Sequence, residues 1–415
     1  MTLDTCTPDA KQLLDINAAL ASICQTTACI NTSETVKLSE ALGRIVSAEI
    51  LAPLDLPIAR NSAMDGYAFR SADVIAGEPT TLKLVGTSWA GQPFVGAVNA
   101  GECVRIFTGA VLPPETDSVA IQEEVAASAQ QVQLPAQIEV HKNVREIGED
   151  LRQGQRLLSQ GKCLTAADLG LLAASGIQQL AVYRRLHIGF CSTGDELIPV
   201  GQPLAPGQIY DSNRYMLQAL LQNPAYQVTD LGIIPDNPEQ LRNTLLPAAQ
   251  QLDVIISTGG VSVGAADHVK DILTEIGSMH FWKLAIKPGK PLAFGKIQDC
   301  VFFGLPGNPA AVLTTYQQIV SPALQHLSGS QPAKPLRLAM RCTQAIKKSP
   351  GRQEFIRGLL LQDAEGELQV APIGMRGSHI MSSSSLANCY IVLAADSSGV
   401  QQNDMVWVEP FSNRL

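Results

Sequence analysis

The stretch between Asp253 and Pro309 constrains the fold more than any other part of the chain. It contains three short apolar runs, DVIISTGG, WKLAIKPGKPLAF and FFGLPGNPAAV, and each opens into a turn rich in Gly or Pro. Short apolar runs that end in small residues are typical of buried parallel strands, whose carboxyl ends present backbone N–H groups at one edge of the sheet. A helix that starts in such a turn adds the positive end of its dipole. This stretch therefore predicts a sheet edge that binds anions.

Lysine and aspartate side chains in the same stretch match an anionic ligand held together with a metal ion. Lys287 and Lys290 flank a Pro-Gly turn, and Lys283 lies just before it. Lysine supplies a compact positive charge for a phosphate or another oxyanion. Asp267 follows the first Gly-rich turn, and a carboxylate beside a bound phosphate is a common ligand of Mg²⁺. The residues alone thus predict a phosphate-bearing ligand and a divalent cation.

The composition favours a soluble multidomain enzyme and argues against several other classes of protein. At 415 residues the chain is longer than one hydrophobic core usually organises. Its net charge of −8 argues against a nucleic-acid-binding protein, because such a protein needs a basic face to displace counterions. The nine cysteines form no CxxC pair, and no apolar run approaches the ~18 residues of a membrane span. We therefore predict a cytoplasmic protein with reduced thiols that binds neither nucleic acid nor a membrane.

The first half of the chain predicts one domain inserted into another. Helical signals in residues 11–41 and 164–180 predict a split helical linking domain formed by residues 1–53 and 146–184. The second of these regions has a Thr cap at Thr165 and a Gly stop. The first region ends in SETVKLSEALG, where a Ser start and a Gly stop predict a second short helix. Short alternating apolar runs predict an antiparallel β domain over residues 54–145. The chain would leave the linking domain, form the β domain and return.

The second half of the chain begins with repeated strand-helix units. Residues 185–334 alternate apolar strands with capped helices, which predicts a three-layer α/β domain with right-handed crossovers onto a parallel sheet. Ligands of such sheets bind at the carboxyl ends of the strands. Residues 335–415 return to short strands and predict a C-terminal β domain built as a barrel or a sandwich. The predicted fold class is α/β multidomain: a three-layer parallel-sheet domain, a split helical arm, an inserted β domain and a C-terminal barrel-like domain.

Nine motifs together resemble one enzyme family along essentially the whole chain. They are RNSAMDGYAFR, RIFTGA, REIGEDLR, STGDEL, YDSNRYML, STGGVSVGAADHVKDIL, KPGKPLAFG, GLPGNPAAV and SHIMSSSSLANCYIVL. In this order they are similar to those of the bacterial molybdopterin molybdenumtransferases, whose relatives include the E domains of plant and animal molybdenum-cofactor proteins. The resemblance implies an enzyme that takes adenylylated molybdopterin and molybdate as substrates, uses Mg²⁺, inserts molybdenum at the dithiolene sulfurs and releases AMP and molybdenum cofactor.

The same resemblance implies an assembly and a place for the active site. It implies an elongated homodimer, in which the active site lies between the α/β domain of one subunit and the inserted β domain of the other. Asp65 and Thr108 would then act across the dimer interface. Other proteins of molybdenum-cofactor biosynthesis are candidate partners.

Individual residues acquire expected roles from their positions in these motifs. The candidate catalytic residues are Glu196, Asp267, Lys283, Lys287, Asp65, Thr108 and Asp150. The carboxylates expected to bind the metal ion are Glu196, Asp236 and Asp267. The residues expected to contact the pterin, the phosphates or the oxoanion are Gly194, Asp195, Gly259, Gly260, Ser262, Gly264, Lys290, Pro306, Asn308, Pro309, Arg352 and Ser383.

The residues alone leave structural alternatives open for several of these roles. TGD and TGG turns also occur as plain strand-to-helix connections. Asp236 can serve to open the helix that starts near Asn237, and Asp65 belongs to an Asp-Gly turn signal. Lys283 and Arg352 can be ordinary solvated side chains.

Two other functions are alternatives to molybdenum insertion. One is the adenylyltransferase that prepares the adenylylated pterin, which shares the α/β domain. The other is a scaffold protein of the same fold, without catalysis. The flanking β domains and the GGVSVG turn favour the molybdenum-inserting enzyme, since the adenylyltransferases are typically a lone domain with a GGTG turn.

Overall fold

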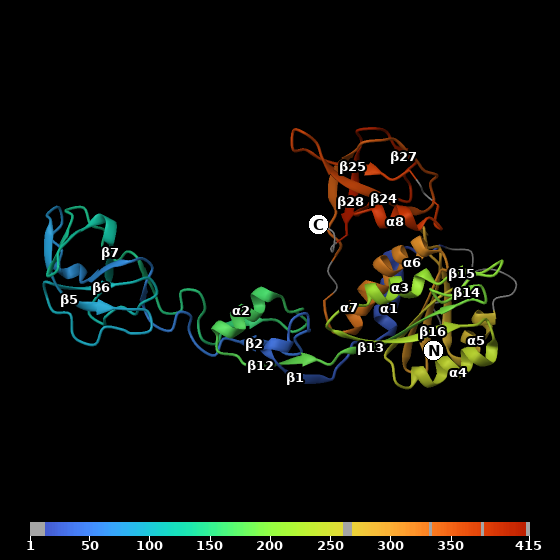
Figure 1. Ribbon diagram of the computed structural model, residues 1–415, viewed down its shortest axis with the longest axis horizontal. Coiled ribbons are helices and arrows are strands. Elements are labelled where there is room, and N and C mark those ends of the chain that lie inside the picture. Colours follow the sequence, from blue (N-terminus) through green and yellow to red (C-terminus); the bar gives the residue numbers. More distant parts are fainter. Residues whose placement is uncertain (1–12, 260–267, 332–333, 375–376, 412–415) are drawn as a thin grey trace, which may run out of the picture.

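The molecule is elongated, with its domains arranged one after another. The computed structural model describes residues 13–259, 268–331, 334–374 and 377–411. A β domain lies at one end, a small linking domain lies in the middle, and an α/β domain lies beside a C-terminal barrel at the other end (Figure 1). The chain passes through the linking domain twice, once toward the β domain and once on the way back.

A six-stranded sheet forms the centre of the α/β domain. Its strand order is β16-β13-β17-β21-β20-β18, in which the first four strands are parallel to one another and β20 pairs antiparallel with both β21 and β18. The predicted parallel sheet is thus confirmed for four strands. The two pairings of β20 are antiparallel because the connections from β18 to β20 and from β20 to β21 are too short for a crossover. The strands are β13 (Leu186–Thr193), β16 (Tyr226–Ile234), β17 (Val254–Thr258), β18 (Ser278–Lys283), β20 (Pro291–Ile297) and β21 (Cys300–Leu305).

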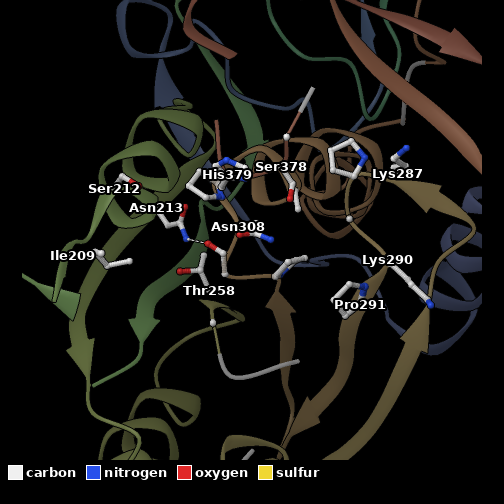
Figure 2. A pocket seen from close by; sticks show the side chains of 18 of the residues that line it. Ile209, Ser212, Asn213, Thr258, Lys287, Lys290, Pro291, Asn308, Ser378 and His379 are labelled. Atoms are coloured by element: carbon white, nitrogen blue, oxygen red, sulfur yellow. Dashed lines mark hydrogen bonds between the residues drawn. The ribbon is translucent and has the colours of Figure 1, made fainter. Parts of the chain in front are cut away.

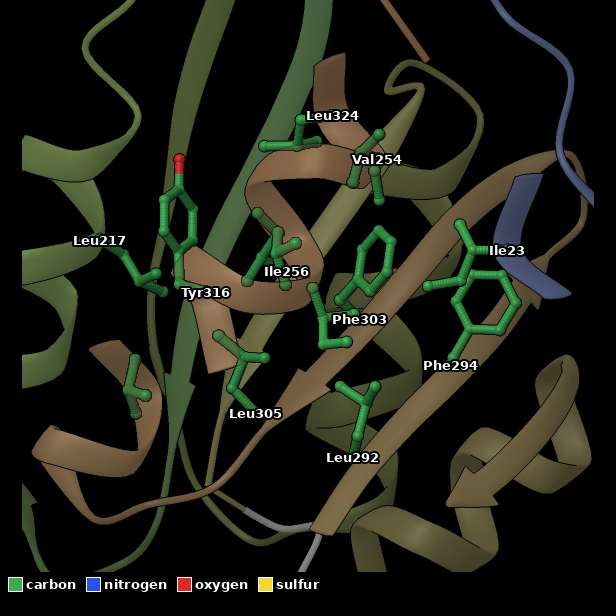
Figure 3. Close-up of a cluster of buried hydrophobic side chains, with 14 of the residues drawn as sticks. Ile23, Leu217, Val254, Ile256, Leu292, Phe294, Phe303, Leu305, Tyr316 and Leu324 are labelled. Carbon is green, nitrogen blue, oxygen red and sulfur yellow. The ribbon is translucent and has the colours of Figure 1, made fainter. Parts of the chain in front are cut away.

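Helices cover both faces of this sheet, as the three-layer prediction requires. Alternate residues of β17 point to opposite faces, so Val254 and Ile256 pack under one helical layer and Ile255 under the other. Figure 3 shows the first of these cores, where Tyr316 and Leu324 approach the sheet. Within the described residues, no helix is long and apolar enough to cross a bilayer. The first layer holds α1 (Ile16–Thr26), α3 (Ser212–Leu220), α6 (Pro309–Thr315), the π-helix η4 (Tyr316–Val320) and α7 (Ser321–Leu327), and the second holds α4 (Pro238–Ala249) and α5 (His268–Ile276).

Helix α1 belongs to the α/β domain by its packing. It buries Ala19 and Ile23 in the core that α7 also covers. The sequence prediction places residues 1–53 in the linking domain, and α1 departs from that assignment. The apolar spacing correctly predicts a helix, but it does not specify which of two cores receives the apolar face.

The segment SETVKLSEALG forms a strand instead of the predicted helix. β1 (Ser33–Lys37) pairs antiparallel with β12 (Gln179–Tyr183), and only a single 3₁₀ turn, η1 (Leu38–Glu40), follows it. The β-branched residues Thr35 and Val36 suit a strand, and a partner strand distant in sequence decides the outcome.

The rest of the linking domain is small and is built around one helix. α2 (Ala166–Ala174) begins with a capping box between Thr165 and Asp168, as the Thr start predicts. A second pair of strands, β2 (Ile50–Leu51) and β11 (Arg156–Leu158), completes the domain.

The inserted β domain contains a six-stranded sheet with the order β7-β4-β6-β5-β9-β8. Its pairs are antiparallel except for β5 and β6, which are parallel, so the predicted wholly antiparallel unit is wrong at this pair. The connection between β5 and β6 is long enough for the chain to cross over. The strands of this sheet are β4 (Gly66–Phe69), β5 (Thr80–Ser88), β6 (Glu102–Ile106), β7 (Ser118–Ile121), β8 (Ala126–Ala127) and β9 (Gln131–Leu134). A separate antiparallel pair is formed by β3 (Asn61–Ser62) and β10 (Val144–Arg145), and the 3₁₀ turns are η2 (Ser71–Asp73) and η3 (Gln122–Glu124).

The C-terminal region is a barrel, which confirms one of the two predicted forms. Five strands follow the order β24-β25-β22-β28-β26, and pairing between β24 and β26 closes the ring. A short strand from the α/β region, β19 (Ile286–Lys287), adds to β24 in parallel. The C-terminal elements are β22 (Leu338–Cys342), β23 (Ile346–Lys347), β24 (Gln353–Gln362), β25 (Leu368–Pro372), α8 (Met381–Leu386), β26 (Cys389–Leu393), β27 (Gly399–Val400) and β28 (Met405–Pro410).

An ion pair fastens the linking segment to the amino end of the central sheet. The guanidinium of Arg184 donates two hydrogen bonds to the carboxylate of Asp253, at 2.6 and 2.7 Å. The backbone N–H of His187 donates to the same carboxylate, and Nε of Arg184 donates to the hydroxyl of Thr32. The two segments that join the linking domain to the α/β domain contain Thr32 and Arg184. Arg184 binds Asp253 directly, and Thr32 is held to the same place through Arg184.

We expect Asp253→Asn to lower the free energy of unfolding by about 1–2 kcal/mol at neutral pH. A bidentate, partly buried ion pair stabilises a fold more than a surface ion pair does. Burial opposes ionisation of Asp253, but the hydrogen bonds and charge of Arg184, with the His187 N–H, outweigh it and lower its pKa. A lowered pKa stabilises the fold above the carboxyl's unfolded pKa, about 3.9, and this contribution disappears as the pH falls through the folded value. The difference in free energy of unfolding between the wild type and Asp253→Asn should therefore become smaller below about pH 4.

Urea unfolding followed across this pH range measures the effect. Glu49→Gln is the control, since Glu49 pairs with Arg156 on the surface at 3.4 Å and we expect a loss below about 0.5 kcal/mol. Equal losses in the two variants, or a difference that does not depend on pH, would contradict the assignment.

Candidate active site

A cleft opens at the carboxyl ends of the parallel strands, between the α/β domain and the C-terminal barrel. Its volume is about 950 Å³, at the upper end of the range for small-molecule sites. The turns after β13, β17 and β21 line it, together with the start of α3, the segment around β19 and part of β24. Figure 2 shows side chains from these elements around one space. The strand ends thus converge on a single cleft.

Two glycines shape the turns after β13 and β17. Gly259 has a φ of 88°, and a Cβ there would lie 2.3 Å from the carbonyl oxygen of Thr193. Gly194 has a φ of 149°, and its Cβ would lie 2.6 Å from Oε2 of Glu196. A side chain at Gly259 would push the two turns apart, whereas one at Gly194 would displace the carboxylate of Glu196 within its own turn. Gly259 therefore sets the distance between the turns, and Gly194 leaves room for Glu196.

The turn after β21 is held against the start of α3. The side-chain amide of Asn213 donates a hydrogen bond of 2.8 Å to the carbonyl oxygen of Gly307 (Figure 2). Asn308 is the N-cap residue of α6 and makes no capping hydrogen bond with its side chain. Asn308, Pro306 and Pro309 all line the cleft, and the two prolines restrict the backbone around the amide.

A chain of buried hydrogen bonds lies under the cleft. The hydroxyl of Ser192 donates to Oδ1 of Asp211 at 3.0 Å and lies 3.1 Å from the hydroxyl of Thr258. Oδ1 of Asp211 also accepts from the backbone N–H of Arg214, so Asp211 caps α3. Asp211 and Thr258 each expose 1% of their surface and line the cleft.

Basic side chains gather on the side formed by the barrel and the segment around β19. Nζ of Lys287 lies 3.1 Å from Oε1 of Glu354, whose side chain is only 10% exposed. Burial lowers the pKa of Arg357, but arginine stays cationic at neutral pH. This side of the cleft can neutralise several anionic oxygens. The basic residues that line it are Lys287, Lys290, Lys347, Arg352 and Arg357.

Two of the predicted metal ligands reach the same cleft. Glu196 and Asp236 both line it, and the backbone N–H of Asp236 donates to the carboxylate of Asp195 at 3.0 Å. Among the residues that the structure describes, no three His, Cys, Asp or Glu side chains form a ready metal cluster. Mg²⁺ at phosphate sites needs only one or two protein carboxylates, because phosphate and water oxygens complete its shell. The two carboxylates fit an ion that binds together with a phosphate-bearing ligand.

Four other predicted residues do not line the cleft. One is Asp195, whose carboxylate accepts a hydrogen bond from the backbone N–H of Asp236. The backbone of Lys283 pairs with Pro291 at the end of β18. Ser383 is buried in α8, where its hydroxyl donates to the carbonyl of Ile380 at 2.9 Å. Asp150 is exposed between the β domain and the linking domain.

Asp65 and Thr108 form a hydrogen-bonded pair at the far end of the molecule. Oδ1 of Asp65 accepts from both the backbone N–H and the hydroxyl of Thr108, each at 2.8 Å. These bonds lower the pKa of Asp65. Asp65 directly precedes β4 and Thr108 follows β6, so the linking domain separates the pair from the cleft of the same chain (Figure 1). Four further predicted residues lie outside the described parts of the chain: Gly260, Ser262, Gly264 and Asp267.

The structure adds cleft residues that the sequence prediction missed. Asp211 and Asn213 stand in YDSNRYML, which reads as a capped helix start, and a cap directly after a strand could have indicated the cleft. Lys347, Arg357 and His379 also line the cleft. His379 stands in the motif SHIMSSSSLANCYIVL, but no local signal identifies Lys347 and Arg357, because the sequence of the barrel does not tell which part of it faces the α/β domain.

Family models match the chain in three consecutive parts. Residues 189–326 match a model described as a probable molybdopterin binding domain. Residues 14–176 match the MoeA N-terminal region (domain I and II), and residues 339–411 match the MoeA C-terminal region (domain IV). Together with the strand-end cleft and its basic side, these matches define a protein of the molybdopterin-binding class with flanking β domains.

Full-length relatives identify the family within that class. A protein from Haemophilus influenzae named molybdopterin molybdenumtransferase is 42% identical over 388 residues, which cover 92% of this chain and 95% of that protein. The chain therefore belongs to the molybdopterin molybdenumtransferase family, as its motifs predict. A protein of the same name from Nostoc is 38% identical over 79% of this chain and 77% of its own length.

A solved structure confirms the fold class over nearly the whole chain. The crystal structure of a molybdopterin biosynthesis MoeA protein from Pyrococcus horikoshii superposes with a TM-score of 0.83 at 26% sequence identity. The superposition covers 96% of this chain and 100% of the chain from Pyrococcus horikoshii.

The two lysines beside the Pro-Gly turn should differ in what their loss costs. We expect Lys290→Met to weaken binding of AMP about tenfold, because one charged hydrogen bond to phosphate is removed, while stability stays unchanged. Lys287→Met should weaken AMP binding and also lower the free energy of unfolding by about 1–3 kcal/mol, because Glu354 keeps its buried charge without a partner.

Isothermal titration with AMP and urea unfolding measure the two effects separately. Lys83→Met is the control, since Lys83 pairs with Glu102 on the remote β domain and should change neither quantity. Unaltered AMP binding by Lys290→Met would show that this side of the cleft does not hold the phosphate.

Proposed function

We propose that this protein inserts molybdenum into molybdopterin. Its substrates are adenylylated molybdopterin and molybdate, and its products are AMP and molybdenum cofactor. The names of its full-length relatives support this transfer. The observation that carries the proposal is the cleft at the strand ends, which five basic side chains line together with the carboxylates of Glu196 and Asp236.

The basic side of the cleft suits the anionic groups of both substrates. Adenylylated molybdopterin carries two linked phosphates, and molybdate is a dianion. Lys287, Lys290 and Arg352 would hold these oxygens and stabilise the charge on AMP as the phosphoanhydride bond breaks. The two dithiolene sulfurs replace oxygens of molybdate, so both substrates must be held side by side. A cleft of about 950 Å³ provides that space.

Glu196 and Asp236 would hold Mg²⁺ beside the phosphates, and bound Mg²⁺ supplies charge neutralisation and orients the phosphate oxygens. Both side chains are hard oxygen donors on adjacent strand-end turns, which suits this ion. Asp195 supports the arrangement, since it accepts the backbone N–H of Asp236.

We further propose that the protein works as a homodimer in the cytoplasm. The Asp65–Thr108 pair lies at the opposite end of the elongated chain from the cleft (Figure 1). A two-fold related copy could bring the pair to the cleft of its partner, which would give these residues the catalytic role that the sequence predicts. Other proteins of the pathway that supply or accept the unstable pterin are candidate partners.

A release assay tests the proposed reaction. The purified protein should release AMP from preformed adenylylated molybdopterin in a manner that depends on both molybdate and Mg²⁺. ATP consumption with free molybdopterin would instead support the adenylyltransferase. Absence of turnover in both assays would contradict the proposed activity.

We expect Glu196→Gln to reduce AMP release at least about 100-fold, because the amide removes the charge that would hold Mg²⁺. Binding of AMP without Mg²⁺ should change less than about twofold, since the basic side of the cleft is intact. Glu239→Gln on α4 is a matched control, because Glu239 is exposed and does not line the cleft. Full activity of Glu196→Gln at saturating Mg²⁺ would exclude Glu196 as a metal ligand.

Mixing two inactive variants tests whether the site is shared between subunits. In a heterodimer of Thr108→Ala and Glu196→Gln subunits, one site carries both changes and the other carries neither. Random mixing should therefore restore about a quarter of the wild-type activity, because half of the dimers regain one of two sites. Recovery that stays at the level of the separate variants would place both residues in the same chain's site, or leave Thr108 outside catalysis.

A further inference from the structure

Hydrogen-bond acceptors collect on the side of the cleft opposite the lysines. Figure 2 shows Asn213 and Thr258 on one side of the pocket, and Lys287 and Lys290 on the other. Asp211 lines the cleft next to Asn213 and is almost completely buried. We call Asp211, Asn213 and Thr258 the acceptor floor.

The hydrogen bonds under this floor fix its polarity. A carboxylate only accepts, so Ser192 must use its single proton for Asp211. Thr258 must then donate its own proton to Ser192, which is 3.1 Å away. The remaining lone pair of the Thr258 hydroxyl can only accept. Asn213 is similarly fixed, because its amide nitrogen donates to Gly307 and its oxygen remains as an acceptor.

Two of these acceptors lack a donor. Among the described residues, neither Oδ2 of Asp211 nor Oδ1 of Asn213 has a hydrogen-bond partner, and both atoms are buried. A buried acceptor without a donor destabilises the protein, so a ligand that brings donors gains this energy on binding. A phosphate or molybdate oxygen would instead meet the negative charge of Asp211. The floor therefore favours a group that presents N–H donors and carries no negative charge.

We propose that the acceptor floor binds the amino-pyrimidine edge of the substrate's pterin ring, while the anionic groups lie on the basic side. This inference rests on the proposed function. The pterin edge presents its exocyclic amino group and the neighbouring ring N–H side by side, as two adjacent donors. The corresponding edge of adenine alternates a donor with an acceptor, and that acceptor would face the acceptors of the floor. The floor thus fixes the orientation of the substrate in the cleft.

Asp211→Asn tests this assignment with little change in shape. The amide oxygen can still accept from the N–H of Arg214 and from Ser192, so the cap of α3 is preserved. The Oδ2 position becomes an N–H donor, which opposes the donor edge of the ring. We expect binding of 6-hydroxymethylpterin, followed by its fluorescence, to weaken about tenfold, while AMP binding stays within about twofold. Thr258→Val removes a different acceptor and should weaken pterin binding about threefold to fivefold.

Two controls separate recognition from general effects. Asp230 pairs with Arg214 of α3 at 2.8 Å and does not line the cleft. Asp230→Asn should therefore bind the pterin like the wild type. On the ligand side, 6-hydroxymethyllumazine carries a carbonyl in place of the amino group and should bind the wild type about tenfold more weakly than the pterin does.

Several results would overturn the proposal. These are no pterin binding by the wild type up to the solubility limit, equal pterin affinity of Asp211→Asn and the wild type, equal losses of pterin and AMP affinity, or the same loss in Asp230→Asn. The outcome is independent of turnover, because neither probe is a substrate. If no AMP is released but the variants show the expected pterin affinities, the proposed reaction is wrong and the proposed pterin contact is supported. If AMP is released but the pterin affinities differ from those expected, the proposed reaction is supported and the proposed pterin contact is wrong.

Discussion

A two-residue strand pairing is the contact on which the cleft depends. Ile286 and Lys287 of β19 lie parallel to Gln353 and Glu354 of β24, so a segment of the α/β region becomes part of the barrel sheet. The backbone N–H of Gln353 donates to Ala285 at 2.8 Å, and the Lys287–Glu354 ion pair adds a charged contact between the same strands. The pairing fixes the barrel over the strand ends. The two domains also share an apolar core, in which Phe355 and Tyr390 of the barrel pack with helices of the α/β domain, so pairing and core together set the distance between the basic side chains and the carboxylates.

The same construction explains why each domain alone is an incomplete site. The sheet supplies Glu196, Asp236 and the buried acceptors, and the barrel supplies Lys347, Arg352 and Arg357. At the other end of the sheet, Asp253 ties the linking segment through Arg184. The linking domain then places the β domain at a distance from the cleft of its own chain (Figure 1). The two attachments lie at opposite ends of the parallel strands, so one sheet organises both the cleft and the extended arm.

The fold followed from the sequence where the pattern was local, and failed where a distant partner decided. Alternating strands and capped helices predicted the layered α/β domain, and Thr165 correctly marked the start of α2. The helix predicted at Ser33 became a strand, because pairing with β12 outweighed its weak helical signals. The parallel pair β5–β6 has no signature in either strand, since strand direction depends on the route of the intervening chain.

The candidate site shows the same division. Gly194, Gly259, Lys287, Asn308 and Pro309 stand in strand-end turns, and the rule that ligands bind there brings them together. Residues predicted only from motif position, such as Ser383 and Lys283, do not line the cleft, because a motif does not specify the direction of a side chain. Asp211 was missed for the opposite reason. It stands at the start of a predicted helix, but its unpaired second oxygen can be recognised only when the packing around it is known.

The two sides of the cleft differ in burial as well as in charge, and this difference has a chemical consequence. Lys287 and Lys290 are exposed, so they can attract anions from solvent but lose part of their strength to screening. Asp211, Asn213 and Thr258 are almost fully buried, where a missing hydrogen bond costs more and discrimination between ligand edges is stronger. Affinity would then come mainly from the phosphates, which many cellular compounds carry. Selection of one ring among those compounds would come from the buried side, because only there is a mismatched donor or acceptor left without water to replace its partner.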